Sequence, residues 1–217
     1  MGKLKAALLG AALGLGALSP AAAQPAKPAY GGSLEIGTVY VTLSALSFDP
    51  ADWNWKLNHD TGLFYEQLFA ADLTKSKQYG GAHPFYADAW LPSDAIRGEL
   101  AESWKWEENP LRVVIDLRKG IMFPERPGVM ASREFVADDV VFAYTRLSTS
   151  PKKIAGYFDH VEKVEATGKH QVTFTFKYYN AEWDYRFGWG YYSTITPKEV
   201  ADAGATNWKN VNEIGRA

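Results

Sequence analysis

Residues 98–147 read GELAESWKWEENPLRVVIDLRKGIMFPERPGVMASREFVADDVVFAYTRL, and this stretch decides the fold. From Leu111 to Leu117 every second residue is hydrophobic, which is the period of a strand with one face in a core. Glu99–Trp106 places a leucine and two tryptophans among polar residues and predicts a half-buried strand. The short turn Glu107–Pro110 joins the two segments, so we expect a hairpin.

A helix is expected after the loop, interrupted by proline and glycine, that follows this hairpin. Hydrophobic residues recur at helical spacing from Val136 to Leu147. Asp138 and Asp139 fall in the first turn, where the helix dipole favours acidic side chains. None of these residues indicates catalytic chemistry.

The chain on either side of this block is mixed. His59–Phe69 predicts a short helix, whereas residues 70–97 are loop-rich and are assigned no firm structure. Val161–Ala166 and Gln171–Lys177 predict a second hairpin about the turn 167–170. Its second strand should face inward through Val172, Phe174 and Phe176.

The C-terminal part carries the signals of a helix start and stop. Thr196–Glu199 has the form of a capping box with proline at the first helical position, and Gly204 is the expected stop. Strands and scattered helices occur without strand–helix–strand alternation. This organisation predicts an α+β domain.

Several segments, taken in order, resemble the family 5 extracellular solute-binding proteins of ABC importers, the dipeptide- and oligopeptide-binding group. Three lie in the opening block: LAESWKW, DLRKGIMF and ADDVVFAYTRL. The others are similar to the family's first strand, its S-x-DP turn, its Y-E-x-L helix and its I-x-PKE motif: Gly31–Gly37, Ser47–Pro50, Tyr65–Phe69 and Ile195–Val200.

The sequence departs from the family pattern at two places. Residues 123–128 replace the usual F-x-D-G. Val136 stands where a threonine commonly caps the following helix, so the cap must come from another group or be absent. Both departures concern a loop and the subfamily rather than the family.

The resemblance implies a periplasmic-binding-protein type II-like fold. Residues 31–217 would form a partial lobe I, with an extra strand-rich accessory subdomain over about 51–180. Family members are usually much longer and close two lobes on a ligand. We therefore expect this chain to be truncated and to lack lobe II; a compact variant of the family is the alternative.

The N-terminus predicts export. A basic start and the hydrophobic run Ala6–Leu18 precede an A-x-A site that places cleavage between Ala23 and Gln24. The run would span only about 20 Å as a helix, short of the roughly 30 Å hydrocarbon core. Residues 1–23 are thus expected to be a signal peptide and 24–30 a flexible leader.

The chain contains no cysteine. Disulfides, thiolate zinc sites and cysteine nucleophiles are therefore excluded. A lipoprotein needs a cysteine at the cleavage point, where this chain has Gln24. We expect a periplasmic protein without a lipid anchor and without direct membrane insertion.

Composition and motifs disfavour several other classes. Removing Lys3 and Lys5 from the 23 basic residues leaves 21 against 25 acidic ones, which disfavours nucleic acid or an anionic membrane as partner. The four histidines have no metal-ligand spacing. Phosphate-binding glycine loops and the GxSxG motif are absent from the sequence. No cofactor and no catalytic residue is predicted.

Ligand contacts are predicted first from the resemblance. The family's segment after the first strand lines the cleft and often pairs with a bound peptide by strand addition. Here it is Tyr40–Ser44, so its candidate residues are Tyr40, Val41, Thr42 and Leu43. An ordinary loop is the alternative.

Tryptophans supply the remaining candidates. Trp53 and Trp55 could stack on a ligand, although tryptophans pack cores at least as often. From Trp183 to Tyr191 aromatic residues occupy every second position, which predicts a strand with one aromatic face. Such a stripe is more often core or interface packing, but Trp189 and Tyr191 are retained as ligand candidates. Gly188 and Gly190 are positions where another group could approach closely.

Three functional hypotheses follow. The first is a periplasmic binding component that captures peptides by cleft closure, delivers them to an ABC permease at the inner membrane and acts as a monomer when complete. Nickel complexes, opines and oligosaccharides are the family's other ligands. The second is an exported carbohydrate-active hydrolase. The third is a fragment that binds nothing alone.

Overall fold

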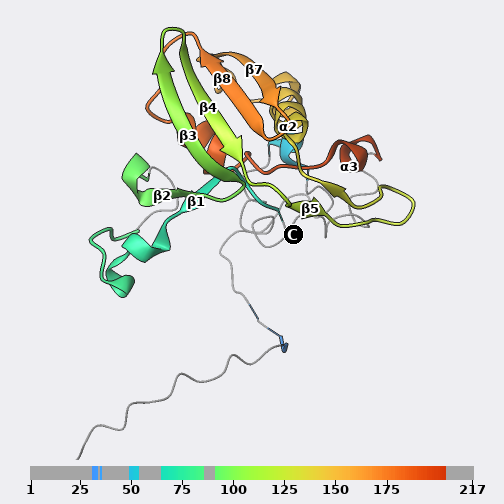
Figure 1. The fold of residues 1–217 in the computed structure, drawn as a ribbon, viewed down its shortest axis with the longest axis horizontal. Helices are drawn as coiled ribbons and strands as arrows, with labels where there is room; N and C mark the ends of the chain where they lie inside the picture. The colour runs from blue at the N-terminus through green and yellow to red at the C-terminus, as the bar shows by residue number, and fades with distance from the viewer. Residues whose placement is uncertain (1–30, 34, 36–48, 54–64, 86–90, 204–217) are drawn as a thin grey trace, which may run out of the picture. The chain divides into compact units, whose positions relative to one another are not determined.

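The computed structural model describes residues 31–33, 35, 49–53, 65–85 and 91–203 (Figure 1). The chain divides into two units, Met1–Thr38 and Val39–Ala217. Every element below belongs to the second unit. The predicted signal peptide, the leader and Gly204 lie outside the described residues, as do Leu34, Ile36 and Gly37 of the predicted first strand. The other four residues of that segment are described and are not in a strand.

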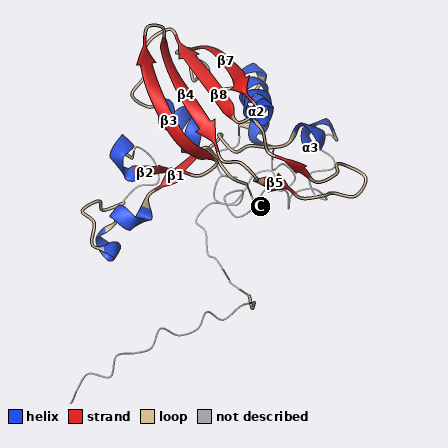
Figure 2. Ribbon diagram, in the orientation of Figure 1, coloured by secondary structure: helices blue, strands red, loops and turns tan. Residues whose placement is uncertain are grey.

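A four-stranded antiparallel sheet is the centre of the second unit (Figure 2). Its strand order is β3-β4-β8-β7, with bounds Ala101–Glu108, Leu111–Leu117, Gln171–Phe176 and Val161–Gly168 respectively. Both predicted hairpins are therefore confirmed, each with a two-residue turn. Pairing of β4 with β8 places Val113 opposite Phe174 and Ile115 opposite Val172. These four side chains are fully buried, because all lie on the face that is covered.

Helix α2, Ala137–Thr149, covers that face by packing on β7 and β8 (Figure 1). It buries Val140 and Leu147, as the helical spacing predicts, and also Ala143. Its N-terminus lacks a capping hydroxyl. Instead the Asp139 carboxylate accepts the Val136 N–H at 3.0 Å, which is half of a capping box.

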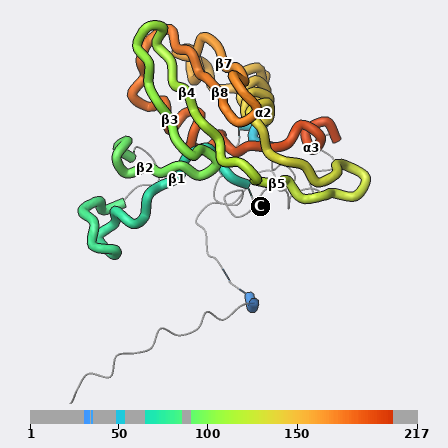
Figure 3. Tube along the Cα trace, in the orientation of Figure 1, coloured from blue at the N-terminus to red at the C-terminus, as the bar shows by residue number. Residues whose placement is uncertain are grey.

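Two smaller antiparallel sheets lie beside the central one. The first pairs β1, Phe69–Ala71, with β2, Ile96–Gly98. The chain between them contains short 3₁₀ turns and forms an arm that extends from the sheet (Figure 3). The second pairs β5, Met122–Phe123, with β6, Arg133–Glu134.

The helix predicted at residues 59–69 is wrong over its described part, 65–69. Phe69 begins β1, and residues 65–68 are extended or bent. The Leu68 carbonyl accepts the N–H groups of Glu99 and Ala101 at 2.9 and 3.0 Å, and the Gln67 carbonyl accepts that of Leu100 at 3.0 Å. These carbonyls therefore bond across to a distant segment rather than within a helix.

The predicted aromatic strand at Trp183–Tyr191 is also wrong. The chain forms a single π-helical turn at Tyr185–Trp189. The Gly190 N–H donates to the Tyr185 carbonyl at 2.8 Å, and the Asp184 carboxylate accepts the Tyr185 N–H at 2.9 Å. Alternation of aromatic residues resembles a strand, but local hydrogen bonding selects the helical turn.

Helix α3, Lys198–Asp202, begins one residue later than the predicted capping box. Pro197 is its N-cap, and no side chain caps it. The Glu199 carboxylate binds Arg133 instead of returning to the helix start. The expected box is therefore not formed.

An aromatic core joins these elements. The rings of Phe174 and Phe187 stack with centroids 4.1 Å apart and an interplanar angle of 8°. Trp106 packs against Phe176 and Trp183 at 5.2 and 5.1 Å.

Within the described ranges, no helix has the length and apolar character that crossing a membrane requires.

Candidate functional site

The segment Asp49–Trp53 follows the predicted cleft segment Tyr40–Ser44 in the sequence after four intervening residues, and α2 holds it in place. The buried Asp49 carboxylate pairs with both terminal nitrogens of Arg146. The Trp53 indole N–H donates to the Leu147 carbonyl at 3.2 Å. The charge-assisted pair and the indole contact fix this end of the segment against the last turns of the helix.

Trp53 lies in the core. It is 7% exposed, and its ring contacts three aromatic rings at centroid distances of 4.5, 5.0 and 5.7 Å. These rings belong to Tyr192, Tyr157 and Phe158, respectively. The ring is thus occupied by protein contacts, and its role in ligand binding stays a prediction.

Trp189 and Tyr191 differ in accessibility. Trp189 is 7% exposed and packs edge-to-face on Tyr185 at 5.0 Å. Tyr191 is half-buried and contacts Tyr185 and Tyr192 at 5.9 and 6.4 Å. Among the described ligand candidates, Tyr191 is therefore the one whose ring packs on two neighbouring rings and is still partly exposed to solvent.

Gln67 supports the turn that carries Tyr191. Its side-chain N–H₂ donates to the Gly190 carbonyl at 2.7 Å and to the Ser193 hydroxyl at 3.0 Å. The Ser193 hydroxyl in turn donates to the same carbonyl at 2.8 Å. Sequence analysis missed Gln67, because its partners lie more than a hundred residues away.

The two glycines of this region allow close approach, as predicted, but the approaching groups belong to the core. A Cβ at Gly188 would lie 2.2 Å from Cδ2 of Phe69. At Gly190 it would lie 2.3 Å from the Tyr185 carbonyl oxygen.

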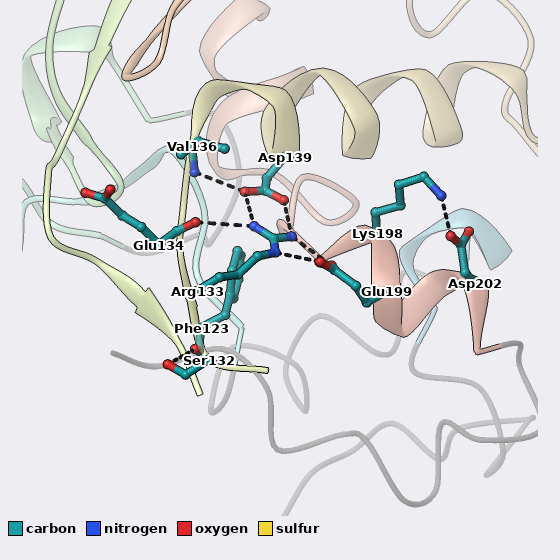
Figure 4. Close-up of polar contacts among 9 residues, drawn as sticks. All are labelled: Phe123, Ser132, Arg133, Glu134, Val136, Asp139, Lys198, Glu199 and Asp202. Carbon is teal, nitrogen blue, oxygen red and sulfur yellow. Dashed lines mark hydrogen bonds and ion pairs between the residues drawn. The ribbon is translucent and has the colours of Figure 1, made fainter. Parts of the chain in front are cut away.

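A second polar cluster joins β6, α2 and α3 (Figure 4). The Arg133 guanidinium binds the Asp139 carboxylate at 2.9 and 2.7 Å and the Glu199 carboxylate at 2.6 and 2.8 Å. It also lies 5.1 Å from the centroid of the Phe123 ring. Its hydrogen bonds to the two carboxylates raise the pKa of Arg133, and the hydrogen bond from Arg133 lowers the pKa of Glu199. The fifth N–H of the guanidinium donates to the Glu134 carbonyl at 3.3 Å, so this arrangement is a clamp with no vacant donor for a ligand.

Two open depressions lie on the described surface. One, of about 520 Å³, is lined by Lys75, Tyr79, His83 and Asp94 among others. The other, of about 460 Å³, adjoins the Arg133 clamp. Neither is lined by a predicted ligand residue. Across the described ranges, no group of three or more acidic or histidine side chains is placed to hold a metal ion.

The remaining predicted site residues lie outside the described residues. They are Tyr40, Val41, Thr42, Leu43, Trp55 and the cleavage pair Ala23 and Gln24. Their roles stay predictions.

Comparison with known proteins identifies the family. The model for bacterial extracellular solute-binding proteins, family 5, middle region, matches residues 95–215, more than half of the chain. The chain belongs to this family. The match contains the whole of the opening sequence block, residues 98–147, so the family that the residues resemble is confirmed.

Named relatives of this family 5 protein are binding proteins. Di/tripeptide-binding protein 2 of Pseudomonas aeruginosa is 34% identical over 45% of this chain and 21% of its own length. Heme-binding protein A of Haemophilus influenzae is 41% identical over 25% of this chain and 10% of its own.

Solved structures share the fold. The binding protein MoaA of A. tumefaciens R10, in complex with mannopinic acid, has a TM-score of 0.57 at 19% identity, over 79% of this chain and 31% of its own. The dipeptide-binding protein of Pseudoalteromonas sp. SM9913, in complex with Met-Leu, has a TM-score of 0.51 at 25% identity, over 77% and 32%. The α+β periplasmic-binding-protein fold is thereby confirmed. The chain spans about a fifth of the first relative's length and about a third of these solved chains.

Proposed function

We propose that this family 5 protein is the solute-binding component of an ABC importer and that it captures short peptides. The family match over residues 95–215 carries the proposal. A di/tripeptide-binding relative at 34% identity and a dipeptide-bound relative at 25% identity support the choice of peptides. The protein would act by binding rather than by covalent chemistry, and would need no cofactor.

In the proposed mechanism a peptide enters a cleft, the cleft closes, and the loaded protein docks on a membrane permease whose partner ATPase drives transport. In this proposal the described residues would form one wall of the cleft. The Arg146 pair fixes the end of the segment before Trp53, and Gln67 shapes the turn that presents Tyr191. Main-chain groups of Tyr40–Ser44 would pair with the peptide backbone.

Export to the periplasm is part of the proposal. Cleavage between Ala23 and Gln24 would release the protein without a lipid anchor. N-terminal sequencing of the protein from the periplasmic fraction should begin at Gln24. A protein that retains Met1, or that stays with the membrane pellet, would contradict this.

Peptide capture is tested by titration calorimetry on the protein purified from its own cells and, in parallel, on the 217-residue chain. The dipeptide Met-Leu and a mixture of di- and tripeptides should give saturable heat. Mannopinic acid, haem and a nickel–histidine complex are the comparison ligands, because relatives or solved neighbours are named for them. If only one of these gave heat, the ligand would belong to that class rather than to peptides. If none of the ligands gave heat, the proposal would be refuted. Heat from the native protein but not from the chain would mark the chain as a fragment that binds nothing alone.

Tyr191→Ala tests the site. It should weaken peptide binding at least about fivefold, since truncating a well-placed aromatic contact at an interface removes more than about 1 kcal/mol. Tyr79→Ala is the matched control, because Tyr79 is 66% exposed and lies on the arm. Equal affinities for the two variants would remove Tyr191 from the site.

A further inference from the structure

His160 is a buried histidine to which the proposed function assigns no role. It lies just before β7 and is 1% exposed. Its ring is nearly parallel to that of Phe176, with centroids 5.7 Å apart and an angle of 11°. Within the described part of the chain, neither ring nitrogen has a hydrogen-bond partner. A neutral imidazole carries one donor and one acceptor, so this burial costs free energy even before the ring is charged.

The charged groups around His160 offer little compensation for a proton. The ring interacts electrostatically with three charged side chains, those of Asp159, Glu182 and Arg186. The centroid of the Tyr178 ring lies 6.4 Å from that of His160. Glu182 is already bound to Arg186, at 2.7 Å. Burial and the Arg186 charge lower the pKa of His160 to about 4, against the weaker opposing effects of the two acids.

The segment that carries His160 is attached to the rest of the core by the packing of the Tyr157 and Phe158 rings on Trp53 and by a few backbone hydrogen bonds. The His160 carbonyl accepts the Lys177 N–H at 2.9 Å, and the Phe158 carbonyl accepts the Val161 N–H at 2.9 Å. Arg186, in the π-helical turn, donates to the Tyr157 carbonyl at 2.7 Å. Moving His160 out of the core would therefore loosen the join between this segment and the turn before Tyr191.

We propose that His160 is an acid-responsive latch: protonation drives its ring into water and releases residues 157–160 from β8 and the π-helical turn. The direction follows from linkage. An opened segment exposes the ring and binds a proton at the ordinary pKa of 6.5, whereas the closed form resists protonation. The closed form is fully favoured above that pKa, and opening grows as pH falls from about 6.5 toward 4.

Amide hydrogen exchange on the full chain tests the latch. Between pH 7 and pH 5, after correction for intrinsic exchange, the open fraction reported by the Val161 and Lys177 amides should rise about twentyfold. The amides of Val113 and Ile115, in the central strand β4, should change by less than about twofold. An unchanged open fraction at Val161 and Lys177 would overturn the proposal.

Two variants assign the effect to His160. His160→Gln and His160→Phe cannot take up the proton, so each should abolish the pH dependence of the two amides. His170→Gln is the matched control, because His170 lies 3.0 Å from the Glu134 carboxylate and should leave that dependence intact. If the open fraction at these two amides still depends on pH in either His160 variant, the latch is refuted. The wild-type chain gives an independent reading by NMR: a His160 ring that titrates near pH 6.5 without local opening also refutes it.

Discussion

Gly188 shows how a residue without a side chain determines where a ring packs. The space that a Cβ would occupy is filled by Phe69, which is fully buried. Phe69 in turn meets Trp104 and Trp183 edge-to-face at 4.7 and 5.7 Å. The close approach of the π-helical turn to β1 therefore depends on glycine at this position.

Gly188→Ala should lower the free energy of unfolding by about 2–3 kcal/mol, because the new methyl group forces the ring and its neighbours to move. Gly168→Ala is the control, since its Cβ would meet the Gln171 Cβ at an ordinary 3.6 Å. That variant should stay within about 1 kcal/mol of the wild type. Urea unfolding measures both, and equal losses would contradict the packing argument.

The N-terminus of α2 shows what an element does when its expected cap is missing. Val136 has the extended backbone of an N-cap residue, with φ −137° and ψ 169°, but offers no hydroxyl. The Asp139 carboxylate accepts a hydrogen bond from the Val136 N–H, and the Lys169 carbonyl accepts one from the Ala137 N–H at 2.9 Å. The missing hydroxyl is therefore partly compensated by other groups.

Val136→Thr should stabilise the protein by about 1 kcal/mol, because a hydroxyl here completes the capping box with Asp139. Thermal unfolding should show a melting temperature a few degrees higher than that of the wild type. Val136→Ala, which removes both γ-methyl groups without adding an acceptor, measures what the side chain contributes by packing. A threonine variant no more stable than the wild type would count against the cap.

Elements with strictly local determinants could be predicted from the sequence. The predictions from the alternation at Leu111–Leu117 and from the helical spacing at Val136–Leu147 are confirmed, because each pattern requires only that one face of the element is buried. Two of the errors lie where a distant group competes. The extended chain at 65–69 bonds to 99–101, and Glu199 of the expected capping box binds Arg133. No local pattern reports such partners.

Across the whole second unit, the Arg133 clamp joins parts of the chain that are far apart in sequence. Glu199 is 66 residues from Arg133, and the Asp139 side chain is 5% exposed. Loss of the guanidinium would leave Asp139 buried without its charged partner, which is costly.

Arg133→Gln should therefore lower the free energy of unfolding by about 2–3 kcal/mol. Arg112→Gln is the matched control, because the Arg112–Glu107 pair lies on the outer face of the sheet with side chains 39% and 32% exposed. Exposed pairs contribute about 0–1 kcal/mol. Chemical denaturation compares the two, and similar losses would show that the clamp has no special role.

Glu134 makes the stability of the unit depend on acid pH. The Lys169 ammonium, the Gly120 N–H and His170 lower its pKa to about 2. A depressed pKa contributes stability that is present above the unfolded value of 4.5 and is lost as pH falls toward 2. Glu134→Gln should make the melting temperature depend less on pH over this window than it does in the exposed control variant Glu125→Gln. Parallel pH profiles for the two variants would contradict this assignment.

The sequence by itself determined the family, the two hairpins and helix α2, because hydrophobic periodicity and ordered motifs are properties of local segments. Only the tertiary structure decided that β4 pairs with β8, that the aromatic stripe forms a π-helical turn, and that Trp53 and Trp189 are buried. It also brought Gln67 to the turn of Tyr191. The strand pairing, the burial of Trp53 and the Gln67 contact depend on hydrogen bonds and ring contacts between residues far apart in the chain, which no local spacing encodes. The π-helical turn instead follows from local hydrogen bonds at Tyr185 that compete with the strand favoured by the alternation.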